Sequence, residues 1–222
     1  MTDQSPFPRP FDAVVFDLDG TLLDTESIAM AAGLDTFASF GHPVEPEFLH
    51  RLIGKDEVTG AALMAAHLGP DFPLADLRRA WRATVQTRFG DGIPLRPGVG
   101  DLLDALDDLA LARAIATSSR RDSALWKLDR AGLGHRFSTV VGLGCIANPK
   151  PAPDPFLHAA HLLGVTATRC LAFEDSETGA ASALAAGMVV VQVPDMLPTD
   201  GRNATHVAPD LMTGARMAGL LR

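Results

Sequence analysis

Two aspartates stand close together directly after the first apolar run of the chain. Residues 13–16 are all apolar, and residues 17–21 follow them with the sequence Asp-Leu-Asp-Gly-Thr. Because side chains alternate along an extended strand, Asp17 and Asp19 are expected on the same side. Two carboxylates held that close require a cation, a shared proton or both. The segment is therefore a candidate for metal-assisted or acid–base chemistry, and Gly20 allows the tight turn that follows.

Three further polar motifs occur later in the chain. They are Thr117-Ser118-Ser119 after the apolar run 112–116, Lys150-Pro151 in a loop, and Glu174-Asp175-Ser176, with Gly179, after the run 170–173. In an open parallel sheet the carboxyl ends of the strands share one edge, and ligands bind there. We therefore expect these motifs to gather around Asp17. Two prolines flank Lys150 and restrict its backbone, which suits a side chain held in a fixed place.

Taken alone, each of these motifs also has a structural explanation. The acidic pair at 174–175 suits the N-terminus of a helix that is expected from residue 178, because helix N-termini favour negative charge. Ser118 or Ser119 suits the cap of a helix expected over residues 122–131. A lysine such as Lys150 is more often a solvated surface charge.

The four motifs, in this order, resemble those of the haloacid dehalogenase superfamily, and the resemblance covers essentially the whole chain. Residues 24–26 and 150–156 are most similar to its phosphatase and β-phosphoglucomutase branch. The resemblance implies that Asp17 attacks phosphorus and becomes an aspartyl-phosphate, while Asp19 acts as general acid and base. It also implies a phosphate site formed by the Thr117 hydroxyl, the Ser118 amide and Lys150.

The same resemblance implies a Mg²⁺ site. Its ligands would be the carboxylates of Asp17 and Asp175 and the backbone carbonyl of Asp19. Glu174 would support these ligands or occasionally bind the ion directly. Oxygen ligands of this kind suit Mg²⁺, which keeps several waters and takes few protein ligands.

Short apolar runs alternate with helical patterns over most of the chain. This alternation predicts an α/β fold, with a Rossmann-like parallel sheet and helices on both of its faces. The expected strands are 13–16, 112–116, 139–141, 170–173, 188–193 and 206–208, and the expected helices between them are 99–109, 122–131, 155–163 and 178–186.

No strand is expected between residues 27 and 89, where helical patterns cover 28–40, 58–68 and 74–89. We therefore expect a small all-helical cap at 25–92, inserted after the first strand of a discontinuous catalytic core at 1–24 and 93–222. An insertion beside the first motif is a candidate lid. The candidate specificity residues within it are Arg51, Lys55 and Arg88, although helix arginines more often pair with surface acids.

The function that fits best is a Mg²⁺-dependent phosphatase for a small phosphate monoester, such as a sugar phosphate or a similar metabolite. Asp19 favours phosphate ester chemistry, because an alkoxide leaving group needs a proton. The alternative is β-phosphoglucomutase-like transfer between sugar hydroxyls. Such mutases usually carry a histidine early in the cap, and residues 25–40 contain none, while Thr21 is retained. A regulatory phospho-acceptor is an alternative from another class of protein.

Composition limits the expected partners and compartment. The 222 residues carry a formal net charge of −8, which disfavours nucleic acid and anionic membranes as partners. No run approaches the about 20 apolar residues of a membrane span. Residues 1–10 lack the apolar core of a signal peptide, so we expect a cytoplasmic protein with Cys145 and Cys170 reduced. We expect a monomer, with a weak dimer as the alternative.

Overall fold

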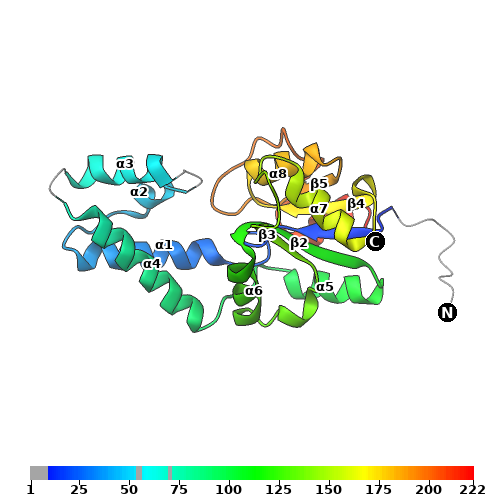
Figure 1. Ribbon diagram of the computed structural model, residues 1–222, viewed down its shortest axis with the longest axis horizontal. Helices are drawn as coiled ribbons and strands as arrows, with labels where there is room; N and C mark the ends of the chain where they lie inside the picture. The colour runs from blue at the N-terminus through cyan, green and yellow to red at the C-terminus, as the bar shows by residue number, and fades with distance from the viewer. Residues whose placement is uncertain (1–9, 54–56, 70–71) are drawn as a thin grey trace. The chain divides into compact units, whose positions relative to one another are not determined.

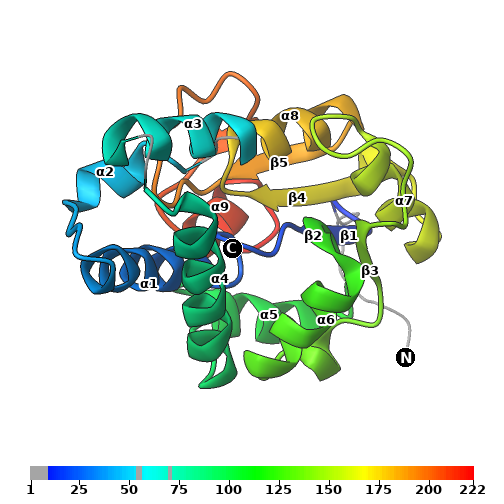
Figure 2. The ribbon, with the colours of Figure 1, turned by 60° about the vertical axis from the view of Figure 1, so that its left-hand side comes forward.

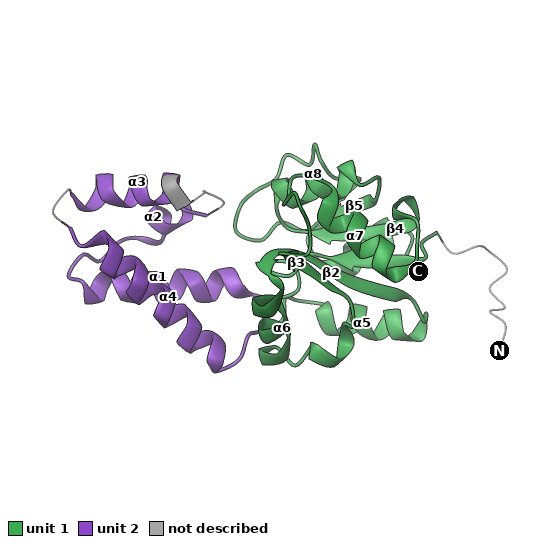
Figure 3. Ribbon diagram, viewed as in Figure 1, with its two compact units in different colours: residues 1–23, 95–222 green, residues 24–94 purple. Residues whose placement is uncertain are grey.

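The computed structural model describes residues 10–53, 57–69 and 72–222 of the chain. The chain divides into two compact units (Figure 3). The first unit joins Met1–Leu23 with Leu95–Arg222, and the second unit is Asp24–Pro94. All strands of the described chain belong to the first unit, and the second unit is helical.

The first unit is built on a six-stranded parallel sheet, which confirms the predicted fold class (Figure 1). Its strands lie side by side in the order β3 (Val140–Leu143), β2 (Ala112–Arg120), β1 (Ala13–Phe16), β4 (Cys170–Glu174), β5 (Val189–Gln192) and β6 (His206–Val207). Each neighbouring pair is parallel. β1 therefore lies inside the sheet, between β2 and β4, and the carboxyl ends of these three strands share one edge.

Helices cover both faces of this sheet, as expected for parallel strands. They are α5 (Val99–Asp108), α6 (Arg121–Arg130), α7 (Asp154–Leu163), α8 (Glu177–Ala185) and α9 (Leu211–Met217), with the short 3₁₀ helices η1 (Gly134–Arg136) and η2 (Ala167–Arg169). α7 and α8 cover one face, while α5, α6 and α9 cover the other (Figure 2).

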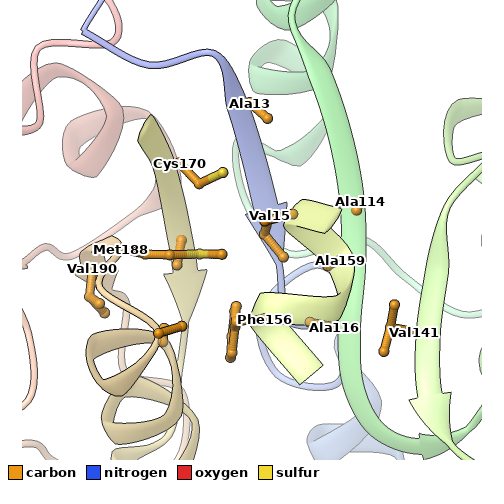
Figure 4. Packing of buried hydrophobic residues seen from close by; sticks show 14 of the residues in the cluster. Ala13, Val15, Ala114, Ala116, Val141, Phe156, Ala159, Cys170, Met188 and Val190 are labelled. Carbon is orange, nitrogen blue, oxygen red and sulfur yellow. The ribbon is translucent and has the colours of Figure 1, made fainter. Parts of the chain in front are cut away.

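The two faces of β1 pack differently because its side chains alternate. Ala13 and Val15 belong to a cluster that is rich in alanine and includes Phe156 of α7 (Figure 4). On the opposite face, the Phe16 ring stacks on the Phe173 ring, with centroids 5.3 Å apart. All of these side chains are completely buried. Burial on both faces fixes β1 in place, and thereby fixes the residues that follow it.

The second unit contains four helices in the described chain: α1 (Thr25–Ser39), α2 (Pro46–His50), α3 (Glu57–Leu68) and α4 (Leu74–Gly90). Its buried core is formed by Phe37, Phe48, Leu49, Met64 and Leu77. α1 packs against α4. The indole nitrogen of Trp81 donates a hydrogen bond to the Ala29 carbonyl at 2.9 Å. Gly33 permits this contact, because a Cβ there would lie 2.7 Å from the Trp81 ring.

Some boundaries differ from those that the sequence predicts. β2 continues past Ala116 to Arg120, so the segment 117–119 is part of the strand and does not follow it. The cause is pairing with β3, where Arg120 lies opposite Leu143. The sequence pattern does not predict α2 or α9, because helices of five and seven residues are too short to show a helical period.

Both cysteines are free thiols, as expected, with Cys170 buried and Cys145 half-buried. None of the described helices combines the length and the apolar character that crossing a bilayer requires.

Candidate active site

Asp17 lies at the carboxyl end of the central strand. The register pairs Phe16 with Ile115 of β2 and with Phe173 of β4. The hydrogen-bond ladder then continues for one more residue, since the Asp17 amide donates to the Phe173 carbonyl at 2.9 Å. The Asp17 side chain is 9% exposed. A buried carboxylate is thus held between the ends of two neighbouring strands, at the sheet edge where the sequence predicts the site.

The backbone makes a tight turn at Gly20, directly after the two aspartates. Its φ is +84°, and its amide donates to the Leu23 carbonyl at 2.9 Å. A Cβ at Gly20 would lie only 2.5 Å from Oδ2 of Asp175. The hydroxyl of Thr21 lies 3.3 Å from Oδ1 of the same carboxylate. The turn therefore forms a close-fitting cradle around Asp175, and only glycine fits at its closest point.

Lys150 joins Asp17 to Glu174. Its Nζ donates to Oδ1 of Asp17 and to Oε1 of Glu174, both at 2.6 Å. The ammonium also lies 5.1 Å from the centre of the Phe156 ring. The Lys150 side chain is 3% exposed, so the reading of it as a solvated surface charge is wrong. Burial opposes its charge, but Asp17 and Glu174 outweigh this effect and raise the pKa of Lys150 above its usual value.

Glu174 is completely buried, and both of its carboxylate oxygens are engaged. Oε2 accepts hydrogen bonds from the Asp175 amide at 3.0 Å and from the Ser176 amide and hydroxyl at 2.9 Å. Ser176, and not the acidic pair, caps α8 by accepting from the Gly179 amide at 3.1 Å. Gly179 also makes room for Glu174, because a Cβ there would lie 1.6 Å from Oε1.

Three carboxylates meet at this edge of the sheet. Oxygens of Asp17, Glu174 and Asp175 lie within 4.8 Å of one another. Burial raises the pKa of Asp17 to about 7, although Lys150 opposes the rise. Burial, followed by the charges of Glu174 and Asp17, also raises the pKa of Asp175 well above its usual value. One ammonium balances only one of the three negative charges, so the group can hold a divalent cation.

Asp19 faces a different set of partners. Nζ of Lys127 donates to Oδ1 at 2.7 Å and to Oδ2 at 2.8 Å. The Ser119 hydroxyl donates to Oδ2 at 2.8 Å. The sequence does not predict the role of Lys127, because it stands alone on α6 with no motif around it. Its scarcity is the available signal, since the chain has only three lysines, at positions 55, 127 and 150.

The Thr117 motif lies beside Asp19 at the end of β2. The Thr117 hydroxyl oxygen accepts a hydrogen bond from the Ser119 amide at 3.0 Å, and its hydrogen has no acceptor among the described side chains. Ser118 is exposed. The N-cap of α6 is Arg120, without a side-chain hydrogen bond, so the expectation that Ser118 or Ser119 caps this helix is wrong. The Thr117 hydroxyl therefore keeps a hydrogen that it can donate to an anion.

The candidate specificity residues belong to the second unit. The Arg51 guanidinium lies over the Phe48 ring, 5.1 Å from its centre. Arg88 forms an ion pair with Asp35, which is the surface pairing that helix arginines commonly make. Lys55 lies outside the described residues. For these three residues, a role in substrate selection stays a prediction.

Comparison with known proteins connects this geometry to a family. A model described as haloacid dehalogenase-like hydrolase matches residues 14–193. The chain is 35% identical to Protein CbbY of Rhodobacter capsulatus, over 93% of this chain and 96% of the relative. It is 30% identical to fructose-1-phosphate phosphatase YqaB of Escherichia coli, over 82% of this chain and 96% of that protein.

A solved structure gives the same result. A HAD family hydrolase from Deinococcus radiodurans with bound phosphate and sodium matches with a TM-score of 0.81 and 29% identity, over 96% of this chain and 99% of that one. The resemblance that the four motifs predict is thereby confirmed. The chain belongs to the haloacid dehalogenase-like hydrolases, as a phosphoric monoester hydrolase.

Proposed function

We propose that this protein is a Mg²⁺-dependent phosphatase that hydrolyses a small phosphate monoester through an aspartyl-phosphate on Asp17. One observation carries the proposal. Asp17 is buried at the end of the central strand, bound by Lys150 at 2.6 Å, and surrounded by two further carboxylates. This arrangement holds a potential nucleophile rigidly, next to a cation and to a group of oxygens that suits a metal.

The reaction would have two displacements. In the first, a carboxylate oxygen of Asp17 bonds to phosphorus, the bond to the leaving oxygen breaks, and Asp19 gives that oxygen a proton. In the second, a water oxygen bonds to phosphorus, the bond to Asp17 breaks, and Asp19 takes a proton from the water. Lys150, the Thr117 hydroxyl and the Ser118 amide would bind the phosphoryl oxygens, whose negative charge needs such donors.

The residues present fit Mg²⁺. The carboxylates of Asp17 and Asp175 are hard oxygen ligands, and their raised pKa values mark a negative charge that burial leaves poorly solvated. Together with the backbone carbonyl of Asp19, they would hold the ion, and Glu174 would keep Asp175 in place through the hydrogen bond to its amide. When bound, Mg²⁺ would offset negative charge on Asp17 and on the phosphoryl oxygens.

The names of similar proteins support a substrate class. One similar protein is named a fructose-1-phosphate phosphatase, which supports a phosphorylated sugar or a similar small metabolite. We extend the proposal to the helical segment 25–92 as a cap that selects the leaving group. Arg51 and Lys55 are its candidate anion-binding residues, whereas Arg88 already has Asp35 as a partner.

Release of inorganic phosphate from a panel of sugar phosphates, nucleotides and phosphoglycolate, with Mg²⁺ present, tests this function. Asp17→Asn is expected to abolish release without unfolding the protein, because the change is nearly isosteric and removes the nucleophile. Asp122→Asn, at an exposed position on α6, is the matched control and is expected to be fully active. Appreciable turnover by Asp17→Asn would contradict the proposal.

The same preparation separates hydrolysis from transfer. A mutase would convert β-glucose 1-phosphate to glucose 6-phosphate when a sugar bisphosphate primer is added, and would release little phosphate. We expect phosphate release to dominate, because residues 25–40 contain no histidine. A long-lived phosphorylated Asp17 without turnover would instead indicate a regulatory phospho-acceptor.

A further inference from the structure

Asp19 is held on both carboxylate oxygens by side chains of two other elements. Lys127 donates to Oδ1 at 2.7 Å and to Oδ2 at 2.8 Å, and Ser119 donates to Oδ2 at 2.8 Å. Lys127 Nζ also lies 3.1 Å from the Ser119 hydroxyl oxygen. The three side chains therefore form a closed triangle of hydrogen bonds, with the Asp19 carboxylate on one corner.

The fold explains why these three residues meet. Asp19 follows β1, Ser119 lies near the end of β2, and β1 pairs with β2 in the sheet. Lys127 belongs to α6, which begins directly after β2 and packs against β2 and β3. The Lys127 side chain is 12% exposed and that of Asp19 is 24% exposed. Partial burial makes this ion pair stronger and better ordered than a solvent-exposed pair.

The two oxygens of Asp19 are not equivalent in this triangle. A carboxylate oxygen has two lone pairs that can accept hydrogen bonds. Oδ2 uses both, one for Lys127 and one for Ser119. Within the part of the chain that the structure describes, Oδ1 accepts one hydrogen bond, from Lys127, and keeps its other lone pair. Of the two oxygens, Oδ1 can therefore exchange a proton while the triangle stays intact.

We propose that Lys127 is a positioning residue which, with Ser119, fixes the Asp19 carboxylate so that Oδ1 exchanges the proton with the leaving oxygen and later with water. The inference rests on the proposed function, because it adds a residue to the role of Asp19 in that reaction. An aspartate side chain has two rotatable bonds, and proton transfer requires it to lie within hydrogen-bond distance of the reacting oxygen. Lys127 removes that freedom.

Two other roles for Lys127 lead to different results. If Lys127 bound the phosphoryl group itself, its loss would slow every ester equally, whatever the leaving group. If it served only the stability of α6, its loss would lower the melting temperature and leave the chemistry of the folded protein unchanged. If Lys127 positions Asp19, the decrease in rate on removing Lys127 should instead depend on how much the leaving group needs a proton.

The experiment measures phenol release in a single turnover, with enzyme in excess, from phenyl phosphate and from p-nitrophenyl phosphate. The two esters have similar shapes, but phenoxide needs protonation much more than p-nitrophenoxide does. Lys127→Met is expected to slow release about tenfold or more from phenyl phosphate, but no more than about threefold from p-nitrophenyl phosphate. Lys127→Arg, which keeps a charged donor, is expected to restore most of the lost rate.

The matched control is Arg130→Met. Arg130 is a cation on the same helix, but its partner is Asp129, away from Asp19. This variant is expected to keep wild-type rates on both esters. In an Asp19→Ala background, adding Lys127→Met is expected to change either rate by less than about twofold, because residues that act through one another are not additive.

Each outcome decides the inference. The positioning role would be overturned if Lys127→Met lowered the rate equally on the two esters. It would also be overturned if Lys127→Met had its full effect in the Asp19→Ala background. Either result would leave the phosphatase function intact. Wild-type protein that releases no phosphate from either aryl ester or from the panel of sugar phosphates, nucleotides and phosphoglycolate would overturn the proposed function itself. A larger loss on phenyl phosphate that disappears without the Asp19 side chain would support the inference.

Discussion

Mg²⁺ is expected to stabilise the protein more at high pH than at low pH. Burial raises the pKa of Asp17 from 3.8 to about 7 in the ion-free protein. The folded protein therefore binds a proton that the unfolded chain has already released, and its free energy of unfolding falls as pH rises between these two values. Asp175, whose pKa is also raised, contributes in the same direction.

The size of this effect follows from the pKa of Asp17. The interval from about pH 5 to about pH 7 lies within the pKa shift and covers about two pH units. Each unit changes the free energy of unfolding by about 1.4 kcal/mol. The ion-free protein is thus expected to lose about 3 kcal/mol over this interval. Bound Mg²⁺ keeps Asp17 as a carboxylate at both ends of the interval, so this loss should not occur in its presence.

Thermal unfolding with and without Mg²⁺, at about pH 5 and about pH 8, measures the difference. A gain that is about 3 kcal/mol larger at the higher pH corresponds to roughly 6–12 °C in melting temperature for a chain of this size. Asp175→Asn should lose most of the gain, whereas the surface variant Asp122→Asn should keep it. An equal increase in melting temperature at the two pH values would refute the reasoning, because the cation and the proton would then not compete for Asp17.

Two glycines provide further tests of close packing, and Gly100→Ala on α5 serves as their control, because no atom lies within 4 Å of a Cβ there. Gly179→Ala would place a Cβ 1.6 Å from Oε1 of Glu174, so we expect it to displace that carboxylate and slow phosphate release by about 10-fold or more. Unchanged turnover would mean that the position of Glu174 is unimportant. Gly33→Ala would place a Cβ 2.7 Å from the Trp81 ring, and we expect it to destabilise the second unit by about 1–3 kcal/mol in denaturant unfolding. A free energy of unfolding equal to that of the Gly100→Ala control would contradict this packing.

Local patterns predict the strands and long helices well because the signal lies within a few residues. The apolar run of β1 and the helical period of α5 depend on neighbours in the sequence, and both elements lie where expected. The end of β2 could not be predicted in this way, since it depends on pairing with β3, which comes later in the chain.

The site shows the same limit. Asp17, Lys150 and Asp175 stand in recognisable motifs, and the parallel sheet explains why they meet. Lys127 has no such motif, and its partner Asp19 is 108 positions away. Only the packing of α6 beside β2 reveals that contact. The sequence around a lysine on a helix surface does not show whether an acid of another element lies opposite it.

The place of β1 within the sheet delays the folding of the first unit during synthesis. β1 leaves the ribosome early, but its register partner Cys170 is made only after most of the chain. Contacts between such distant segments are slow to form, because the loop between them must close first. The second unit, Asp24–Pro94, is one continuous segment with its own core, so it can fold while β4 is still unmade. We therefore expect a nascent chain to carry a folded helical segment long before β4 is available to pair beside Asp17.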